Sequence, residues 1–335
     1  MESLKRILFK KEISIEDLGY ICQLLKTNMS LKECLLLIKN KRNEKIFNSV
    51  IAKLDEGYLI EEIIIDYLPS QIKQYMSSLL KTMSFEVALS LALEFYDKHK
   101  QESGTLIQSI AYPCILLFIT ITSLYLFDLY GMDLIFSLMK TFNTNLSFYD
   151  NLRIIFRIII NIFYYGVLII ICFLLYACSN KHITIFYMYM SKYFHNSLFN
   201  IYYSEEFVSL LSICINKGFK TKDTLMILKN MKSKPIVSFL AFHLDEALLE
   251  GESLNDAIKT QYYDSFLTRF IKIANYTNEM SLMLDNYTKF ARDRIIKKLK
   301  RYSLTIQIAT YSFIGVIIIF IYQILFMPMQ ALSGF

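Results

Sequence analysis

The sequence predicts an all-α integral membrane protein with three transmembrane helices and two homologous cytoplasmic helical-bundle domains. Its composition is the first observation behind this prediction. The chain has 335 residues, of which 54% are hydrophobic and 20% are charged, a mixture too apolar for an ordinary soluble protein and too charged for a fully embedded one. The second observation is that three long apolar segments stand between polar regions that show helical periodicity and repeat each other about 190 positions apart.

Each apolar segment is long enough to cross a bilayer, which needs about 20 residues in a helix. We assign the spans to residues 106–127, 158–178 and 304–327. Pro113 lies inside the first span, where it should kink the helix unless neighbouring helices satisfy the freed carbonyl. The third span ends before Pro328 and carries Gln307 and Gln323, whose amides can form interhelical hydrogen bonds.

Basic residues beside the spans predict their orientation, because cytoplasmic flanks are enriched in Lys and Arg. These residues are Lys98, Lys100, Lys181, Arg292, Arg294, Lys297, Lys298, Lys300 and Arg301. We therefore place residues 1–105 (the first module) and 179–303 (the second module) in the cytoplasm, and the connection 128–157 and the tail 328–335 outside it. The protein should be a multi-pass protein of the plasma or inner membrane, with its N-terminus cytoplasmic and its C-terminus extracytoplasmic. No signal peptide is recognisable, so the first span should act as the insertion signal.

The two modules share a short motif. Leu35–Asn40 reads LLLIKN and Leu225–Asn230 reads LMILKN. Ahead of these motifs, Asn28 and Gly218 occupy matching positions, and both residue types accept a positive φ at the end of a helix. This exchange of Asn for Gly indicates a shared backbone turn, which is stronger evidence for a duplication than shared leucines.

A second pair of turns follows in each module, at Gly57 and Gly251, where a helix should end in a left-handed residue. The offset is then 194, so the second module holds about four extra residues between the motifs. Ser30 and Glu33 form a predicted capping box, in which Asp223 matches Glu33. Each module is expected to be an all-α bundle of about five or six helices.

Few residues of this chain are arranged for chemistry. The six cysteines form no C-x-x-C pair and are expected to be reduced thiols, while the four histidines are scattered and His243 lacks a second helical ligand at i+4. The sequence contains neither a Walker A motif nor G-x-G-x-x-G, and its basic residues form no concentrated stripe. We expect no catalytic residue, cofactor, metal or direct nucleic-acid contact, and hence no enzyme.

Arg153 and Arg157 stand four residues apart at the outer end of the second span. They are either anchors that extend to the membrane surface or contacts for acidic groups of something inserted beside the spans. The apolar run from Leu134 to Met139 in the outer connection indicates an interfacial helix.

The ordered set of these markers resembles the type II secretion system F family, the inner-membrane platform proteins of type II secretion systems, type IV pili and competence pseudopili. The resemblance covers about residues 17–328. It is carried by the segment Asn28 to Leu35, by the matching segment that begins at Gly218, and by the glycines Gly57 and Gly251. The sequences AYP at 111–113 and MP at 327–328 complete the set. Composition and length are more similar to the short competence proteins of Gram-positive bacteria, the ComGB-like branch. The family's Gly-Glu-x-Ser/Thr-Gly signature is replaced at residues 82–86 and 276–279, which puts any metal or contact role of that signature in doubt.

The resemblance implies a non-enzymatic platform for assembly of a filament, serving DNA uptake or protein secretion. Its modules would dock a hexameric assembly ATPase and its spans would receive pilins or pseudopilins, with Pro113, Arg153, Arg157, Gln307 and Gln323 as candidate contacts. A homo-oligomer, a dimer or a trimer, is expected because three spans enclose little space. The alternative is a membrane subunit of an ATPase-driven transporter, which would require polar or charged groups inside the spans.

Overall fold

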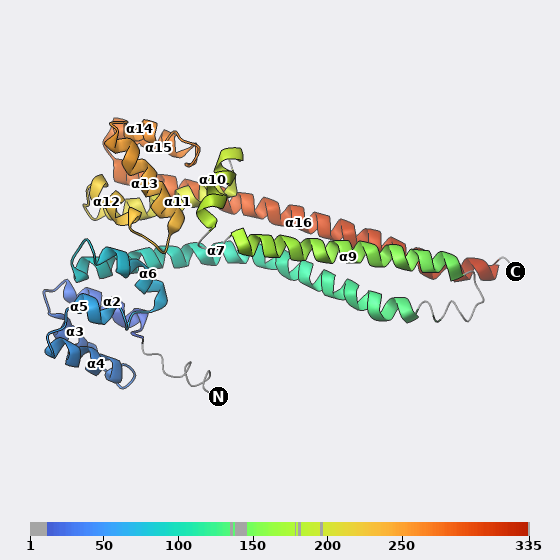
Figure 1. Cartoon of the computed structure of the whole chain (residues 1–335), viewed down its shortest axis with the longest axis horizontal. Helices are drawn as coiled ribbons and strands as arrows, with labels where there is room; N and C mark the ends of the chain where they lie inside the picture. The colour runs from blue at the N-terminus through green and yellow to red at the C-terminus, as the bar shows by residue number, and fades with distance from the viewer. Residues whose placement is uncertain are drawn as a thin grey trace. The chain divides into compact units, whose positions relative to one another are not determined.

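A computed structural model describes residues 12–134, 137, 146–177, 179, 182–194 and 197–333 of the chain (Figure 1). Every regular element in these ranges is a helix, so the predicted all-α class is confirmed. The structure divides into two compact units. The first unit joins Met1–Ser103 to Thr184–Asp293, and the second joins Gly104–Ile183 to Arg294–Phe335.

The first module consists of five short helices and the beginning of a long one. These are α2 (Ile15–Leu25), α3 (Leu31–Ile38), α4 (Glu44–Asp55), α5 (Ile60–Ile64), α6 (Ser70–Leu79) and the start of α7 (Phe85–Leu126). Helix α2 begins where the Ser14 side chain accepts a hydrogen bond from the Asp17 backbone N–H. Its apolar side chains recur every three or four residues and are buried, which is the pattern of a helix with one face in a core.

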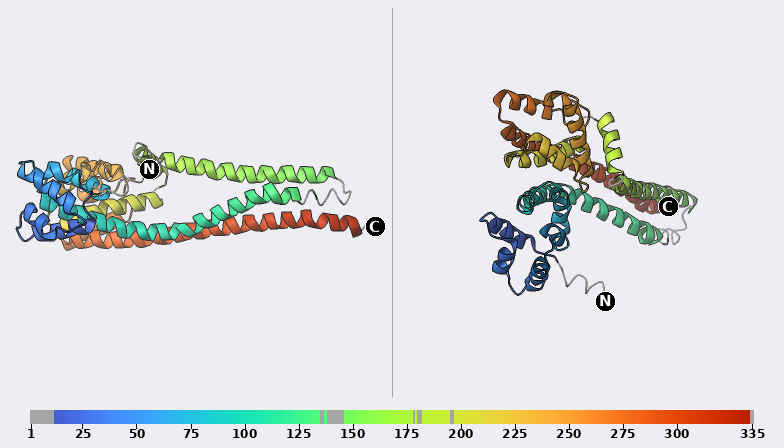
Figure 2. Two further views of the ribbon diagram at one scale, coloured as in Figure 1. Left: turned by 90° about the horizontal axis from the view of Figure 1, so that it is seen from below. Right: turned by 60° about the vertical axis from the view of Figure 1, so that its left-hand side comes forward.

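The second module follows the same order of helices. It is preceded by α10 (Ile183–Tyr193) and contains α11 (Leu198–Asn216), α12 (Thr221–Lys229), α13 (Pro235–Leu249), α14 (Leu254–Ala257), α15 (Leu267–Thr277) and the start of α16 (Met280–Ser333). In both modules a helix of moderate length is followed by a short one, a longer one, a very short one, a helix of ten or eleven residues and then a long helix. The right-hand view of Figure 2 shows these short helices as two groups, blue for the first module and yellow to orange for the second.

The second unit is built from the long helices. It contains the rest of α7, a π-helical turn η1 (Phe127–Gly131), α9 (Leu146–Ala177) and the rest of α16. Three elements are long and apolar enough to cross a membrane by length and composition: Ala111–Leu134, Leu198–Asn216 and Met280–Gln323. The described part of α9 adds a shorter apolar stretch, Arg157–Ile169.

The sequence also predicted three membrane-spanning helices, but one of the three candidates, Leu198–Asn216, is not a predicted span. Helix α11 was expected in the second module, and 67% of its most apolar stretch is buried by protein. It also carries Glu205 and Glu206, which are buried and paired with cations. A lipid-facing helix would expose this stretch, so α11 is a core helix of the module, and α9 takes the place of the second predicted span.

The helices that contain the predicted spans extend beyond the span boundaries. Helix α7 runs without a break through the expected boundary at residue 106, because no proline interrupts the helical pattern before Pro113. Helix α9 begins at Leu146, inside the expected outer connection, and α16 continues past Pro328 to Ser333. A proline removes one helical hydrogen bond and does not by itself end a membrane helix, because neighbouring groups can satisfy the freed carbonyl. The interfacial helix expected near residues 134–139 lies mostly outside the described residues.

Candidate functional site: the turns, charged contacts and membrane helices

The turns predicted from Asn and Gly have left-handed backbones. Asn28 has φ 63°, Gly57 has φ 87°, Gly218 has φ 86° and Gly251 has φ 89°. After Gly57, the Tyr58 N–H donates to the Lys53 carbonyl at 3.2 Å, while the Gly57 N–H donates to the Leu54 carbonyl at 3.1 Å. This pair of bonds is the Schellman motif that ends many helices.

The same two bonds recur in the second module. At Gly251 they reach the carbonyls of Leu248 and Ala247, at 3.2 and 3.0 Å. At Gly218 the corresponding distances, to Ile215 and Cys214, are 2.9 and 3.2 Å. The helices α4, α11 and α13 therefore end in one common geometry that requires a positive φ.

The start of α3 has the predicted capping box. The Glu33 N–H donates to Ser30 Oγ at 3.3 Å, and the Ser30 N–H donates to Glu33 Oε2 at 2.8 Å. The backbone bond lowers the pKa of the Glu33 carboxyl from its ordinary value. In α12 the N-cap is Lys220, whose side chain makes no capping bond, and Asp223 lies in the first turn, where its charge favours the helix dipole.

A further cap was missed by the sequence prediction. Ser253 caps α14: its Oγ accepts from the Asp256 N–H at 3.2 Å and donates to Asp256 Oδ2 at 2.5 Å. The signal was present as Ser followed by Asp three residues later, immediately after Gly251.

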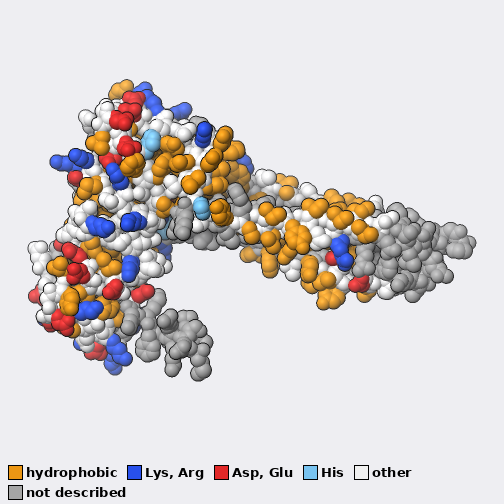
Figure 3. Space-filling view, in the orientation of Figure 1, with side chains coloured by type: hydrophobic (Ala, Val, Ile, Leu, Met, Phe, Trp, Pro, Cys, Tyr) orange, Lys and Arg blue, Asp and Glu red, His pale blue; other side chains and the backbone are white. Residues whose placement is uncertain are grey.

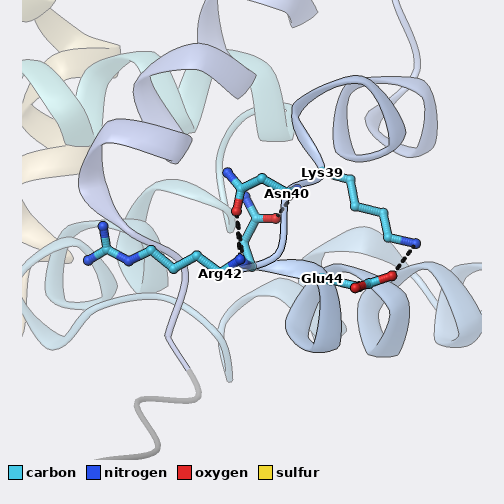
Figure 4. Close-up of polar contacts among 5 residues, drawn as sticks. Lys39, Asn40, Arg42 and Glu44 are labelled. Atoms are coloured by element: carbon cyan, nitrogen blue, oxygen red, sulfur yellow. Dashed lines mark hydrogen bonds and ion pairs between the residues drawn. The ribbon is translucent and has the colours of Figure 1, made fainter.

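The link between α3 and α4 is a compact polar turn (Figure 4). The Asn40 N–H donates to Asn43 Oδ1 at 2.8 Å, while Asn40 Oδ1 accepts from the N–H groups of Arg42 and Asn43 at 2.9 and 3.1 Å. Lys39 pairs with Glu44 at 3.3 Å on one side, and the Arg42 side chain extends away on the other. The shared Lys-Asn ending of the repeated motif thus forms a local turn in the first module.

The first module contacts the second through α6 and α7. Lys217, at the end of α11, pairs with Glu94 at 2.6 Å and donates to Ser90 Oγ at 2.7 Å. Ser78 donates to the Asn230 carbonyl at 3.0 Å, and Ser233 donates to the Gln74 carbonyl at 3.1 Å. Lys217 directly precedes Gly218, so the turn that ends α11 helps to position its ion pair, while Asn230 and Ser233 lie in the link between α12 and α13.

Buried ion pairs hold the centre of the second module. Glu205 is 2% exposed and accepts from Arg292 at 3.2 Å, while Glu206 is 7% exposed and pairs with Lys234. His99 of α7 lies in the same electrostatic environment: burial lowers its pKa, and the positive charge of Lys234 lowers it further. Removing one member of such a pair would leave an uncompensated buried charge.

In the second unit, η1 and α9 are joined by a charged pair. Asp128 lies in the π-helical turn, is 7% exposed, and accepts from Arg157 Nε at 3.3 Å. Gly131 permits this turn, because a Cβ there would lie 2.6 Å from the Phe127 ring. Arg157 thus pairs with an acidic residue of its own chain, a partner that neither of the two roles considered from the sequence includes.

The other predicted span residues are distributed over the long helices. Pro113 is buried inside α7, and Gln323 is exposed on α16. The Gln307 amide donates to Ser303 Oγ at 3.1 Å on its own helix, one turn earlier. The side chain of Arg153 lies outside the described residues. A bond between Tyr112 and Tyr311 hydroxyls, 3.0 Å apart, links α7 to α16.

These features define a membrane protein whose small helical modules continue as unbroken helices into apolar segments. Residues 207–328 match the family model of protein F of the type II secretion system. The match begins in α11 and ends in α16, so it includes most of the second module and the apolar part of α16. The resemblance to this family is therefore confirmed over these residues.

A second match is to a single curated protein. The chain is 26% identical over 138 residues to ComG operon protein 2 of Bacillus subtilis (strain 168). The aligned part is 41% of this chain and 42% of that protein, so the chain matches less than half of its relative's length. Over these residues the two matches relate the chain to protein F of the type II secretion system and to ComG operon protein 2.

Proposed function

We propose that the chain is a non-enzymatic platform for assembly of a type IV pilus-like filament, either a competence pseudopilus or a type II secretion pseudopilus. The observation that carries this proposal is the match to protein F across the second module and α16. In this role the protein would support DNA uptake or protein secretion. The matched relative, ComG operon protein 2, favours the competence alternative.

The proposal places both modules in the cytoplasm as two copies of one docking module for a hexameric assembly ATPase. The recurrence of the same glycine-ended turns in the two modules supports the duplication. Two long helices support mechanical coupling: α7 has 42 residues and α16 has 54, and each begins in a module and continues into an apolar segment. Because an α-helix rises about 1.5 Å per residue as one hydrogen-bonded rod, a displacement of a module would be carried along it.

The spans would receive pilin helices from the membrane. Exposed apolar side chains cover α9, including Ile154, Ile158 and Ile162, and such a surface accepts either lipid or another apolar helix. Pro113, Arg153, Arg157, Gln307 and Gln323 remain our proposed contact positions in the spans. A dimer or a trimer would bring more helices around the incoming pilin.

The experiment is deletion of this chain from its host, followed by complementation, with surface filaments and DNA uptake scored in parallel. We expect both to be lost and both to return with the wild-type chain. Normal filaments in the deletion strain would refute the platform role. A deletion strain that retains filaments but fails to move a solute would instead favour the membrane subunit of a transporter.

A further inference from the structure

Helix α10 begins at Ile183, a few residues after α9 ends at Ala177. The Ser179 N–H donates to the Tyr176 carbonyl at 3.2 Å, and the Ser179 carbonyl accepts from the N–H groups of His182 and Ile183 at 2.9 and 3.0 Å. The rings of Tyr176 and His182 stack with centroids 4.6 Å apart across this turn. Ser179 therefore links the last turn of α9 to the first residue of α10 by backbone hydrogen bonds.

One face of α10 is apolar and open. Its residues recur at helical spacing, so they share a side of the helix. They are Ile185, Met188, Tyr189 and Tyr193, followed by Phe194, and all are exposed. Tyr189 and Tyr193 are 63% and 67% exposed, and Lys192 is exposed beside them. Figure 3 shows hydrophobic side chains gathered over this helix.

The opposite face of α10 is fixed to the second module. Tyr187 is 1% exposed, and its hydroxyl donates to the Tyr262 carbonyl. Its ring packs edge-on against Tyr203, with centroids 5.3 Å apart, and Phe186 packs against Phe199 at 5.6 Å. Burial raises the pKa of Tyr187 above its ordinary value, so the hydroxyl remains a donor. The open face is therefore presented by a helix that is anchored in a packed core.

We infer that α10 is an interfacial helix whose open face lies in the membrane surface at the end of α9. The occupant of this face is lipid, at the boundary between headgroups and acyl chains. An amphipathic helix with aromatic and aliphatic residues on one side and a cation at its edge binds in this way. The inference needs α9 to cross the membrane and does not depend on the platform role.

Two observations favour lipid over a protein partner. The first is continuity, because the hydrogen bonds of Ser179 link the start of α10 to the end of α9, a helix that the apolar sequence assigns to the membrane. The second is residue type, since tyrosines concentrate at membrane interfaces, where the ring is apolar and the hydroxyl remains hydrated. Helix α10 would thus attach the second module to the bilayer at a second point besides α16.

The sequence contains no tryptophan, so a single tryptophan is a background-free probe. We would prepare full-length Tyr189→Trp and the control Tyr58→Trp, reconstitute both in bilayer nanodiscs, and replace ordinary phosphatidylcholine with chain-brominated lipid. Tyr58 is 56% exposed in the first module, at the turn after α4. The expected result is that Tyr189→Trp loses fluorescence in brominated lipid and emits at shorter wavelength, while Tyr58→Trp does neither.

Two results would overturn the inference. If Tyr189→Trp emits like Tyr58→Trp and is not quenched, the face is in water. If its emission is shifted to shorter wavelength but brominated lipid leaves it unquenched, protein covers the face. Tyr193→Trp, on the same side of α10, should repeat the behaviour of Tyr189→Trp and serves if that variant is poorly folded.

Discussion

Gly57 offers the sharpest test of the helix-ending turns, because its substitution isolates backbone conformation. A Cβ added at Gly57 would have no heavy atom within 4 Å, and the same is true of Gly19 inside α2. Neither Ala substitution creates a clash, but Gly57 has φ 87° and Gly19 has helical backbone. Gly57→Ala and Gly19→Ala are therefore matched variants of one module that differ in the sign of φ.

The expected difference follows from two energies. An L-residue in the left-handed region costs about 1–2 kcal/mol, and replacing Gly by Ala gains about 0.4–1 kcal/mol by restricting the unfolded chain. The second energy is common to both variants and cancels in their difference. Gly57→Ala should therefore be less stable than Gly19→Ala by about 1–2 kcal/mol, with Gly57→Asn between them because Asn tolerates this region.

Urea titration of the full chain in nanodiscs, with protease cleavage of the first module as the signal, would measure this difference. With a slope of about 2 kcal/mol per molar urea, the two midpoints should be about 0.5–1 M apart. Wild type should lie between Gly57→Ala and Gly19→Ala. Equal midpoints for the two Ala variants would refute the argument that these turns need a left-handed residue.

Three further predictions concern charge, packing and pH. Asp128→Asn and Arg157→Gln should each lower the stability of the second unit by about 1–3 kcal/mol. The charge exchange, Asp128→Arg together with Arg157→Asp, should restore part of this stability. Thermal unfolding in nanodiscs measures the recovery, and no recovery would mean that the pair does not stabilise the unit. Leu225→Ala, at a fully buried position of α12, should lower the stability by about 2–5 kcal/mol. The neighbouring Met226→Ala, at a 54% exposed position, should change the stability by less than about 0.5 kcal/mol. Equal urea midpoints for the two variants would contradict the assignment of buried and exposed faces. His99 has a lowered pKa in the folded chain, so the unfolded chain binds a proton at this residue more readily. Stability should therefore fall as the pH drops below about 6.5. His99→Gln should flatten this pH dependence of stability, and an unchanged profile would exclude His99 as its source.

Local chemistry made part of this structure predictable. The order of helices follows from apolar periodicity, and positive φ at Gly57 and Gly251 follows from residue type and position after a helix. The capping box at Ser30 is likewise a property of four consecutive residues. Such features need no knowledge of what lies elsewhere in the chain.

The remaining features depend on distant residues. Glu205 and Glu206 are tolerated inside apolar α11 because Arg292 and Lys234 meet them, and no local pattern announces those partners. The contact of Lys217 with Glu94 likewise joins segments far apart in sequence. The π-helical turn at Asp128 adds a residue to the helical register and turns the carboxylate toward Arg157, a partner 29 residues further along the chain.

The platform role is tested most directly by site-specific photocrosslinking in cells that are assembling filaments. A photoreactive residue would be placed at Leu36, exposed on α3 of the first module, or at Ile162, exposed on α9, and the adducts would be identified by mass spectrometry. The account predicts the assembly ATPase on Leu36 and a pilin on Ile162. Filament-producing cells in which neither position captures either partner would contradict it.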